Sequence, residues 1–165
     1  MTFDADIYKL SDEFFADYPA DRYPELMRKP DRPYYCLLID IHADYFICVP
    51  FRSNINHANA YMFKKSERSR RTHSGLDYTK IVIISKSNYF DDSAAIVDSD
   101  EYKEAMKNIR RIVHSTLKYV NGYIDCVNGT KALNQSAYDR KYKYSTLPYF
   151  HDIMGIKDIE AAAAE

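Results

Sequence analysis

The 165-residue sequence contains no tryptophan, only four glycines and only three cysteines. The cysteines form no CxxC pair, and Cys36 and Cys48 lie in apolar runs, where cysteine usually acts as a small buried hydrophobe. This odd number of cysteines, without a secretory signal, predicts a reducing, cytoplasmic setting. No apolar run approaches the roughly 18 residues that a transmembrane helix requires, so we expect no membrane partner.

Several catalytic signatures are also missing. No glycine-rich loop follows the first apolar segment, which argues against a dinucleotide or P-loop site. The absence of a G-x-S-x-G motif argues against a Ser-His-Asp hydrolase. The five histidines are scattered, without the i, i+4 spacing of a helical metal site. We therefore expect neither a metal ion nor a cofactor.

The composition is typical of one small globular domain. With 46% apolar residues the chain is long enough for one core and short for two, and we expect a single domain over residues 1–160. The alanine-rich residues 161–165 are expected to lie outside it, as an added tail or a frayed helix end. The formal net charge is −1, so attraction to nucleic acid has to come from a local cationic patch.

The residue pattern predicts a helix, then several strands, then helices. Ser11 is an N-cap candidate followed by two acids. Residues 34–41 and 45–51 are typical of an antiparallel pair joined by a tight turn, and their near-continuous apolar character predicts that both faces of both strands are covered. Further strands are expected at residues 61–63, 80–85 and 94–96, with Gly75 in a turn.

The C-terminal half holds the best helical pattern. Asp98 and Glu101 stand at capping-box spacing, and apolar residues then recur every 3.6 positions until the Asn-Gly pair at 128–129, which should end the helix. A last short helix is expected at 148–154, closed by Gly155. A run of strands followed by a long helix indicates an α+β fold and not a doubly wound α/β sheet.

The most informative segment follows the strand at 45–51. It carries a dense set of polar side chains: Arg52, Ser53, Asn54, Asn56 and His57. A ribonuclease that uses no metal needs a base for the 2′-hydroxyl proton, a cation for the charge on the phosphorane, and donors that hold the phosphate. Arginine supplies a bidentate phosphate contact, and histidine ordinarily titrates near neutral pH. The cluster therefore predicts catalysis on RNA, with ordinary turn and helix-cap chemistry as the alternative.

A basic run lies between this cluster and the next strand. It comprises Lys64, Lys65, Arg68, Arg70 and Arg71 against a single acid, Glu67, and His73 stands just beyond it. Its position predicts that it follows the phosphates of an RNA backbone, together with His73. The alternative is a solvated charged loop, because most charge runs have no other role.

The same residues resemble the ToxN/AbiQ superfamily of type III toxin–antitoxin endoribonucleases, and most closely its CptN and TenpN branches. The resemblance is carried by VPFRSNINHANAYMF at 49–63 and SGLDYTKIVII at 74–84. It extends more loosely to RPYYCLLIDI at 32–41 and YSTLPYFHDIM at 144–154. The specific part is the combination of R-S-x-I-x-H with a downstream G-L-D-[YF]-[ST]-K.

The resemblance implies a MazF/Kid-like fold, in which a compact, strongly bent, barrel-like antiparallel sheet is elaborated with helices. It implies metal-independent cleavage of single-stranded RNA, such as mRNA, to 2′,3′-cyclic phosphate and 5′-hydroxyl ends. The implied partner is a repeat RNA antitoxin, folded as a pseudoknot, that inhibits the toxin and assembles with it into a closed protein–RNA oligomer. The implied setting is the bacterial cytoplasm, in defence by phage abortive infection.

Residue roles follow from the same match. The ToxN loop carries a Thr-Ser pair followed by a lysine, whereas this chain has an Arg-Ser pair and no lysine after it. This departure leaves the cationic role to Arg52 and the proton transfer to His57. Arg32 matches a basic residue before the first long strand. Lys80 ends the G-L-D-Y-T-K match as a phosphate-binding candidate, and its alternative is a strand-start residue paired with Asp77.

Two alternatives without catalysis remain open. An RNA-binding module would use Arg52 and the basic run only to grip phosphates, and it predicts binding without cleavage. A protein-interaction domain would present the amphipathic helix that begins at Asp98, and it predicts no affinity for RNA.

Overall fold

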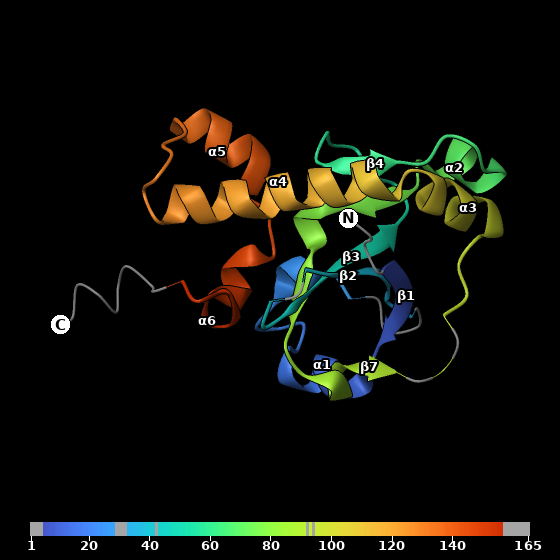
Figure 1. Ribbon diagram of the computed structural model, residues 1–165, viewed down its shortest axis with the longest axis horizontal. Helices are drawn as coiled ribbons and strands as arrows, with labels where there is room; N and C mark the ends of the chain where they lie inside the picture. The colour runs from blue at the N-terminus through green and yellow to red at the C-terminus, as the bar shows by residue number, and fades with distance from the viewer. Residues whose placement is uncertain (1–4, 29–32, 42, 92, 94, 157–165) are drawn as a thin grey trace.

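An antiparallel sheet forms the centre of the fold (Figure 1). The computed structural model describes residues 5–28, 33–41, 43–91, 93 and 95–156. Within them, seven strands form one sheet in the order β4-β5-β3-β2-β1-β7, and β6 also pairs with β3. The strands are β1 (Ala5–Leu10), β2 (Tyr35–Asp40), β3 (Phe46–Arg52), β4 (Ala60–Met62), β5 (Gly75–Asp77), β6 (Val82–Ile84) and β7 (Phe90–Asp91).

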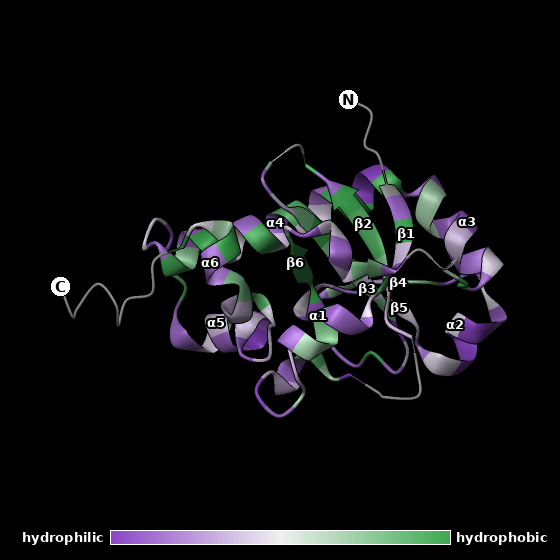
Figure 2. Ribbon diagram, turned by 90° about the horizontal axis from the view of Figure 1, so that it is seen from below, coloured by the Kyte–Doolittle hydropathy of each residue, from purple (hydrophilic) through white to green (hydrophobic). Residues whose placement is uncertain are grey.

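The hairpin of β2 and β3 matches the predicted strand pair. Its register runs from Cys36 opposite Pro50 to Asp40 opposite Phe46. Four consecutive residues are buried in each strand, as continuous apolar runs predict, and the middle of β2 is green in Figure 2. The prediction that both strands are covered on both faces is therefore confirmed.

Strand β3 is shared between two parts of the sheet. Its first half pairs with β6, from Phe46 opposite Ile84 to Cys48 opposite Val82, and its last two residues pair with β5. Among the described residues no pairing joins β7 back to β4 or β6, so the sheet is open. The expected closure into a barrel-like sheet is therefore not seen, because the last two residues of β3 pair with β5 and not with β6.

Helices cover the sheet and extend the molecule at both ends. In Figure 1, α4 runs across the view, with α2 and α3 at one end and α5 at the other. Side chains of α4 such as Ile112 and Val120 join the strand residues in one hydrophobic cluster. None of the helices described here is both long enough and apolar enough to cross a membrane. The helices are α1 (Asp12–Asp17), α2 (Glu67–Thr72), α3 (Ser99–Lys107), α4 (Ile109–Val127), α5 (Gln135–Tyr142) and α6 (His151–Met154).

Several predicted helix ends are confirmed. The Ser11 hydroxyl accepts a hydrogen bond from a backbone N–H of the first turn of α1. The Asp98 Oδ1 atom accepts from the backbone N–H groups of Asp100 and Glu101. Gly155 ends α6 with a left-handed φ of 72°, which glycine adopts without strain. Each of these signals acts over a few residues of sequence, so it needs no tertiary partner.

Two predictions in this region are wrong. The long helix expected from Asp98 is divided into α3 and α4 at Asn108, whose backbone N–H and side-chain amide both donate to the Glu104 carbonyl oxygen. Gly75 is not in a turn but begins β5, where an added Cβ would collide with the backbone oxygen of Tyr61. The glycine is therefore required by the close approach of β4 and β5.

Other elements extend or correct the pattern. The basic run is not wholly a loop, because residues 67–72 form α2 with Ser66 as its N-cap. The predicted strand at 80–85 is shorter, since β6 is preceded by a 3-10 helix at Tyr78–Lys80. Residues 95 and 96 are in no strand, and residue 94 lies outside the described part. The sequence pattern does not predict β1 or α5, because polar residues interrupt the apolar periodicity of both elements.

Candidate functional site

The polar segment after β3 forms a loop that is fastened to the end of α2. The Asn54 N–H donates to the Thr72 carbonyl (2.6 Å), and the Ile55 N–H donates to the His73 carbonyl (3.1 Å). Asn54 has a left-handed φ of 59°, which asparagine tolerates, and the Ile55 side chain is buried. These contacts hold residues 52–57 in place, so that their polar side chains project from a fixed loop.

Asp77 lies at the centre of the site, although sequence reasoning gave it no catalytic role. It ends β5, next to the point where Arg52 of β3 pairs with Gly75. The Arg52 Nε atom lies 3.6 Å from Asp77 Oδ2, and the His57 Nε2 atom lies 3.2 Å from Asp77 Oδ1. One buried carboxylate therefore holds two of the five predicted catalytic residues together.

The Asp77 carboxylate stays ionised in spite of its burial. Burial by itself acts to raise its pKa, but hydrogen bonds from His57 and Thr79 outweigh this effect and lower the pKa below 3.8. Thr79 donates to Oδ1 through its backbone N–H (2.9 Å) and its hydroxyl (2.6 Å). The site thus carries a fixed negative charge between Arg52 and His57.

Both ring nitrogens of His57 have hydrogen-bond partners. Its Nδ1 atom accepts from the backbone N–H of Asn59 at 3.1 Å, so Nε2 carries the proton and donates to Asp77. A substrate hydroxyl can deliver a proton to Nδ1 only if it displaces the Asn59 N–H. That hydrogen bond is local and neutral, and bonds of this kind contribute about 1 kcal/mol net, so displacement is energetically accessible.

Arg52 and His57 line a cavity of about 520 Å³, which we call the polar cavity. The same cavity is lined by residues 139–141 of α5, and the Asn59 side-chain amide donates to the Arg140 carbonyl oxygen (3.1 Å). The predicted residues that the structure brings to it are Arg52, Ser53, Asn54, Asn56, His57 and Lys80.

The cations Arg140 and Lys141 are functional candidates that sequence reasoning missed. They stand 81 or more positions beyond Asn59, in a helix whose pattern is weak, and only the fold brings them to the polar cavity. The clustered Asp-Arg-Lys triplet at 139–141 was the only available signal, and it is not specific.

Lys80 lines the polar cavity, but its charge is already paired. Its Nζ atom donates to Glu25 Oε2 and to the Tyr144 carbonyl oxygen, both at 2.8 Å, and its side chain is only 6% exposed. The alternative role, a pairing with Asp77, is therefore wrong, because the 3-10 helix after β5 directs Lys80 toward Glu25 instead. Phosphate binding by Lys80 stays a prediction.

Part of the basic run has a structural role. The Arg68 Nη1 atom donates to both carboxylate oxygens of Glu101 at 2.9 Å. The backbone N–H groups of Lys64 and Lys65 each donate to Glu104 Oε1 at 2.9 Å. These contacts join the start of α2 to α3, so this stretch is an anchored corner of the fold and not a free loop.

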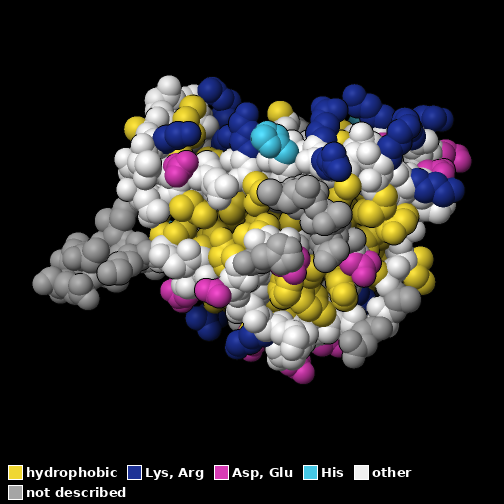
Figure 3. Space-filling view, viewed as in Figure 1, with side chains coloured by type: hydrophobic (Ala, Val, Ile, Leu, Met, Phe, Trp, Pro, Cys, Tyr) yellow, Lys and Arg dark blue, Asp and Glu magenta, His cyan; other side chains and the backbone are white. Residues whose placement is uncertain are grey.

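The remaining basic side chains lie on the surface. Arg70, Arg71 and His73 are exposed at the C-terminal end of α2, and none of them lines the polar cavity. Figure 3 shows lysine and arginine side chains gathered along one edge of the molecule, where α5, α4 and α2 lie in Figure 1. Their RNA-binding role stays a prediction, as does that of Arg32, which lies outside the described residues.

Comparison with known proteins finds no match to the chain among family models, curated proteins or solved structures. Within the described ranges, no group of three or more histidine, cysteine, aspartate or glutamate side chains converges in a way that could hold a metal ion. The site is therefore interpreted from its own geometry and chemistry.

Proposed function

We propose that the protein is a metal-independent endoribonuclease that cleaves single-stranded RNA at the polar cavity. The observation that carries this proposal is the convergence of Arg52 and His57 on the buried Asp77 carboxylate. A cation and a proton acceptor beside one cavity are the two groups that a phosphodiester transesterification needs. The R-S-x-I-x-H and G-L-D-Y-T-K segments, through which the chain resembles ToxN/AbiQ endoribonucleases, supply these residues.

In the proposed reaction, the 2′-oxygen of RNA attacks the adjacent phosphorus, and the bond from phosphorus to the 5′-oxygen breaks. His57 Nδ1 takes the proton of the 2′-hydroxyl after the Asn59 N–H is displaced, and the departing 5′-oxygen takes a proton from water. The products are a 2′,3′-cyclic phosphate and a 5′-hydroxyl. Arg52 stabilises the negative charge that develops on the phosphoryl oxygens.

Asp77 orients both groups in this reaction. It accepts a hydrogen bond from the His57 Nε2–H group, which favours the tautomer with no proton on Nδ1 and orients the ring, as a carboxylate does for the histidine of a catalytic triad. It also stabilises the imidazolium ion that forms when His57 is protonated. The nearby Ser53 and Asn56 side chains line the polar cavity as candidate donors to the phosphate.

The biological part of the proposal follows from the resemblance. The protein would be the toxin of a type III toxin–antitoxin system in a bacterial cytoplasm, with a structured repeat RNA as its inhibitor and as its partner in a closed assembly. In the same way, the open, antiparallel sheet would be a variant of the MazF/Kid-like fold, with β3 as its strongly bent strand.

A second candidate function is an RNA-binding module without catalysis. It is favoured by one observation, the engagement of both His57 ring nitrogens with Asp77 and Asn59. In this alternative the cations of the polar cavity bind phosphate, and His57 serves only to hold the loop in place through its contacts with Asp77 and Asn59.

RNA cleavage in excess EDTA separates the two functions. We expect the purified protein to cut single-stranded RNA and to leave 5′-hydroxyl ends that polynucleotide kinase labels directly. His57→Gln should slow cleavage by about 10² to 10⁴ while RNA is still bound. His114→Gln changes an exposed histidine on α4 that does not line the polar cavity, so it serves as the matched control. If the unmodified protein binds RNA without cleaving it, the proposed ribonuclease activity is refuted.

A further inference from the structure

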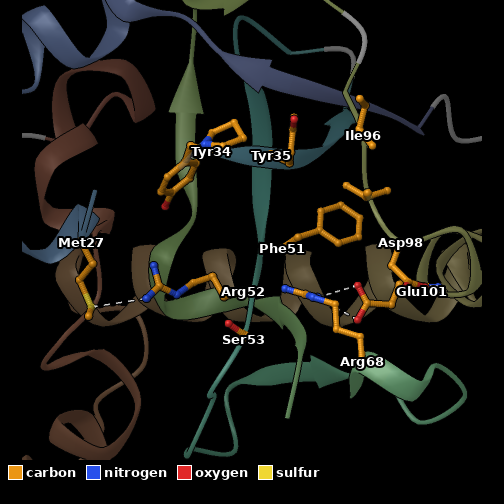
Figure 4. A pocket seen from close by; sticks show the side chains of 12 residues that line it. Met27, Tyr34, Tyr35, Phe51, Arg52, Ser53, Arg68, Ile96, Asp98 and Glu101 are labelled. Atoms are coloured by element: carbon orange, nitrogen blue, oxygen red, sulfur yellow. Dashed lines mark hydrogen bonds and ion pairs between the residues drawn. The ribbon is translucent and has the colours of Figure 1, made fainter. Parts of the chain in front are cut away.

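A second cavity adjoins the polar cavity, and Arg52, Ser53 and Met27 line both. Its volume is about 290 Å³, and we call it the aromatic cavity. In Figure 4, Arg52 and Met27 lie on one side of it, and Arg68, Glu101 and Asp98 lie on the other. A phosphate bound to Arg52 would therefore lie where the two cavities meet.

The two cavities differ in the types of residue that line them. Among the described residues that line the polar cavity, Met27, Ile55 and Tyr144 are apolar or aromatic, and the others, His57 included, are polar or charged. The aromatic cavity has a mainly apolar lining that comprises Met27, Pro33, Tyr34, Tyr35, Phe51, Ile96 and Val97. A nucleotide has the same division, because a charged phosphate is joined through the sugar to a flat, largely apolar base.

Phe51 provides a fixed aromatic surface in this cavity. Its ring stacks on Phe63, with an interplanar angle of 17° and 5.8 Å between the ring centroids. Phe63 is buried in the core, so the stacking contact keeps the Phe51 ring in a fixed position. In Figure 4 the Phe51 ring projects from β3 between the two sides of the cavity. Bases stack on aromatic rings of this kind without strong preference for their identity.

Arg68 supplies hydrogen-bond donors at the opposite side. Only its Nη1 atom donates to Glu101, and it does so to both oxygens. The Nε and Nη2 atoms of Arg68 make no hydrogen bond to another described residue, and Figure 4 shows the guanidinium extended toward Arg52 across the cavity. Arginine is the side chain that most often recognises the acceptor atoms of guanine.

Asp98 supplies the complementary acceptor. Its Oδ1 atom caps α3, since it accepts from the backbone N–H groups of Asp100 and Glu101. Its other carboxylate oxygen takes no part in these bonds, and Asp98 lines the aromatic cavity. A carboxylate oxygen accepts hydrogen bonds from the N–H groups of a base but repels an edge that carries only acceptors.

We propose that the aromatic cavity binds the RNA base on the 5′ side of the cleaved phosphate, and that it selects guanine. The base packs on Phe51, its acceptor atoms receive hydrogen bonds from Arg68, and its N–H groups donate to Asp98. Guanine offers two adjacent N–H donors beside a carbonyl acceptor, which no other RNA base combines. This inference rests on the proposed function for the position of the phosphate at Arg52.

Calorimetric titration with the four nucleoside 3′-monophosphates tests the base pocket without any cleavage. We expect 3′-GMP to bind about tenfold or more tightly than 3′-AMP, 3′-CMP and 3′-UMP. Asp98→Asn should remove this preference while α3 stays capped, because asparagine is as good an N-cap as aspartate. Asp100→Asn makes the same charge change at an exposed neighbour and should keep the preference. Phe51→Leu should weaken the binding of all four nucleotides to a similar extent.

The result that would overturn the inference is equal binding of all four nucleotides, or an Asp98→Asn protein that still prefers 3′-GMP. The proposed function fails separately, when RNA is not cleaved although 3′-GMP is preferred. If RNA is cleaved equally well after each of the four bases, the proposed ribonuclease activity is supported and the selection of guanine is refuted. His57→Gln should leave the 3′-GMP preference intact, which separates the base pocket from the proton transfer.

Discussion

Two arginine–carboxylate pairs bring their arginines to the aromatic cavity, and they hold these arginines in different ways. The Arg52 Nε atom lies 3.6 Å from Asp77, and within the described part of the chain its Nη2 atom has only the weak acceptor Sδ of Met27 at 3.8 Å. Arg68 donates to both oxygens of Glu101 at 2.9 Å. Glu101 is 1% exposed and accepts in addition from the hydroxyls of two buried serines.

This difference separates a binding pair from a structural pair. Arg52 is drawn toward Asp77 but keeps donors for a phosphate, while Asp77 shares its charge with His57. Glu101 has its oxygens enclosed by protein donors, and it joins α3 to α2. A buried carboxylate therefore indicates neither role by itself. The geometry and number of its donors distinguish them, and the following experiments test that distinction.

The largest effect is expected at the structural pair. Glu101→Ala should lower the free energy of unfolding by about 3–5 kcal/mol, because it leaves Arg68 and two buried hydroxyls without their acceptor. Urea denaturation followed by circular dichroism measures this change. Glu67→Ala, at an exposed position in α2, should cost less than about 1 kcal/mol. Similar losses for the two variants would contradict the structural role of Glu101.

At the binding pair, activity should fall more than stability. Asp77→Asn should slow RNA cleavage by about 10² or more, since His57 loses the carboxylate that orients it. The free energy of unfolding should fall by only about 1–3 kcal/mol, because Asn retains an acceptor for Thr79. Asp125→Asn removes one negative charge from α4 outside the polar cavity and should leave both quantities close to normal. Full activity in the Asp77→Asn protein would exclude Asp77 from the mechanism.

The acid stability of the protein should report the state of Asp77. Because folding lowers the pKa of this carboxyl below 3.8, its contribution to stability is complete above that pH and is lost as the pH falls through the lower, folded-state value. The stability advantage of the unmodified protein over Asp77→Asn should thus be present at about pH 5 and shrink toward about pH 3. An advantage that grows on acidification would reverse the assigned direction of the pKa shift.

A substitution at Gly75 tests how closely β4 and β5 approach each other beside the binding pair, Arg52 and Asp77. In Gly75→Ala the new methyl group meets the Tyr61 backbone oxygen, so β4 and β5 have to separate, at a cost of about 1–3 kcal/mol. Gly122→Ala places its methyl group 2.7 Å from the Tyr142 hydroxyl, which is a side-chain and not a backbone atom, and alanine is the better helix former within α4, so this variant should cost less. Thermal melts of the two variants make the comparison. Equal costs would mean that the β4–β5 contact is not tight.

The smallest effect is expected at the cations of α5. Replacing Arg140 and Lys141 with glutamine should reduce the slope of log affinity against log salt by about 1.4, if each contacts one phosphate of single-stranded RNA. The paired control, Arg70→Gln with Arg71→Gln, removes two exposed cations of α2 outside the polar cavity. Filter binding at several salt concentrations gives both slopes. A larger change for the α2 pair would place the RNA backbone along α2 and away from α5.

The sequence by itself determined the parts of the fold that depend on neighbouring residues. The caps at Ser11 and Asp98, the left-handed Gly155 and the β2–β3 hairpin could all be predicted, because hydrogen bonds and apolar runs of a few residues specify them. The composition of the polar loop was likewise visible, since its candidate residues lie within one segment of chain.

Only the tertiary structure decided which charges are partners. Asp77 and Glu101 reach their arginines across 25 and 33 positions, and α5 reaches the polar loop across 81. The change of the partner of β3 from β6 to β5 and the break at Asn108 also depend on such distant contacts. A charged side chain has the same local pattern whether it is solvated, structural or catalytic, because its energy depends on burial and on partners that the folded chain brings to it.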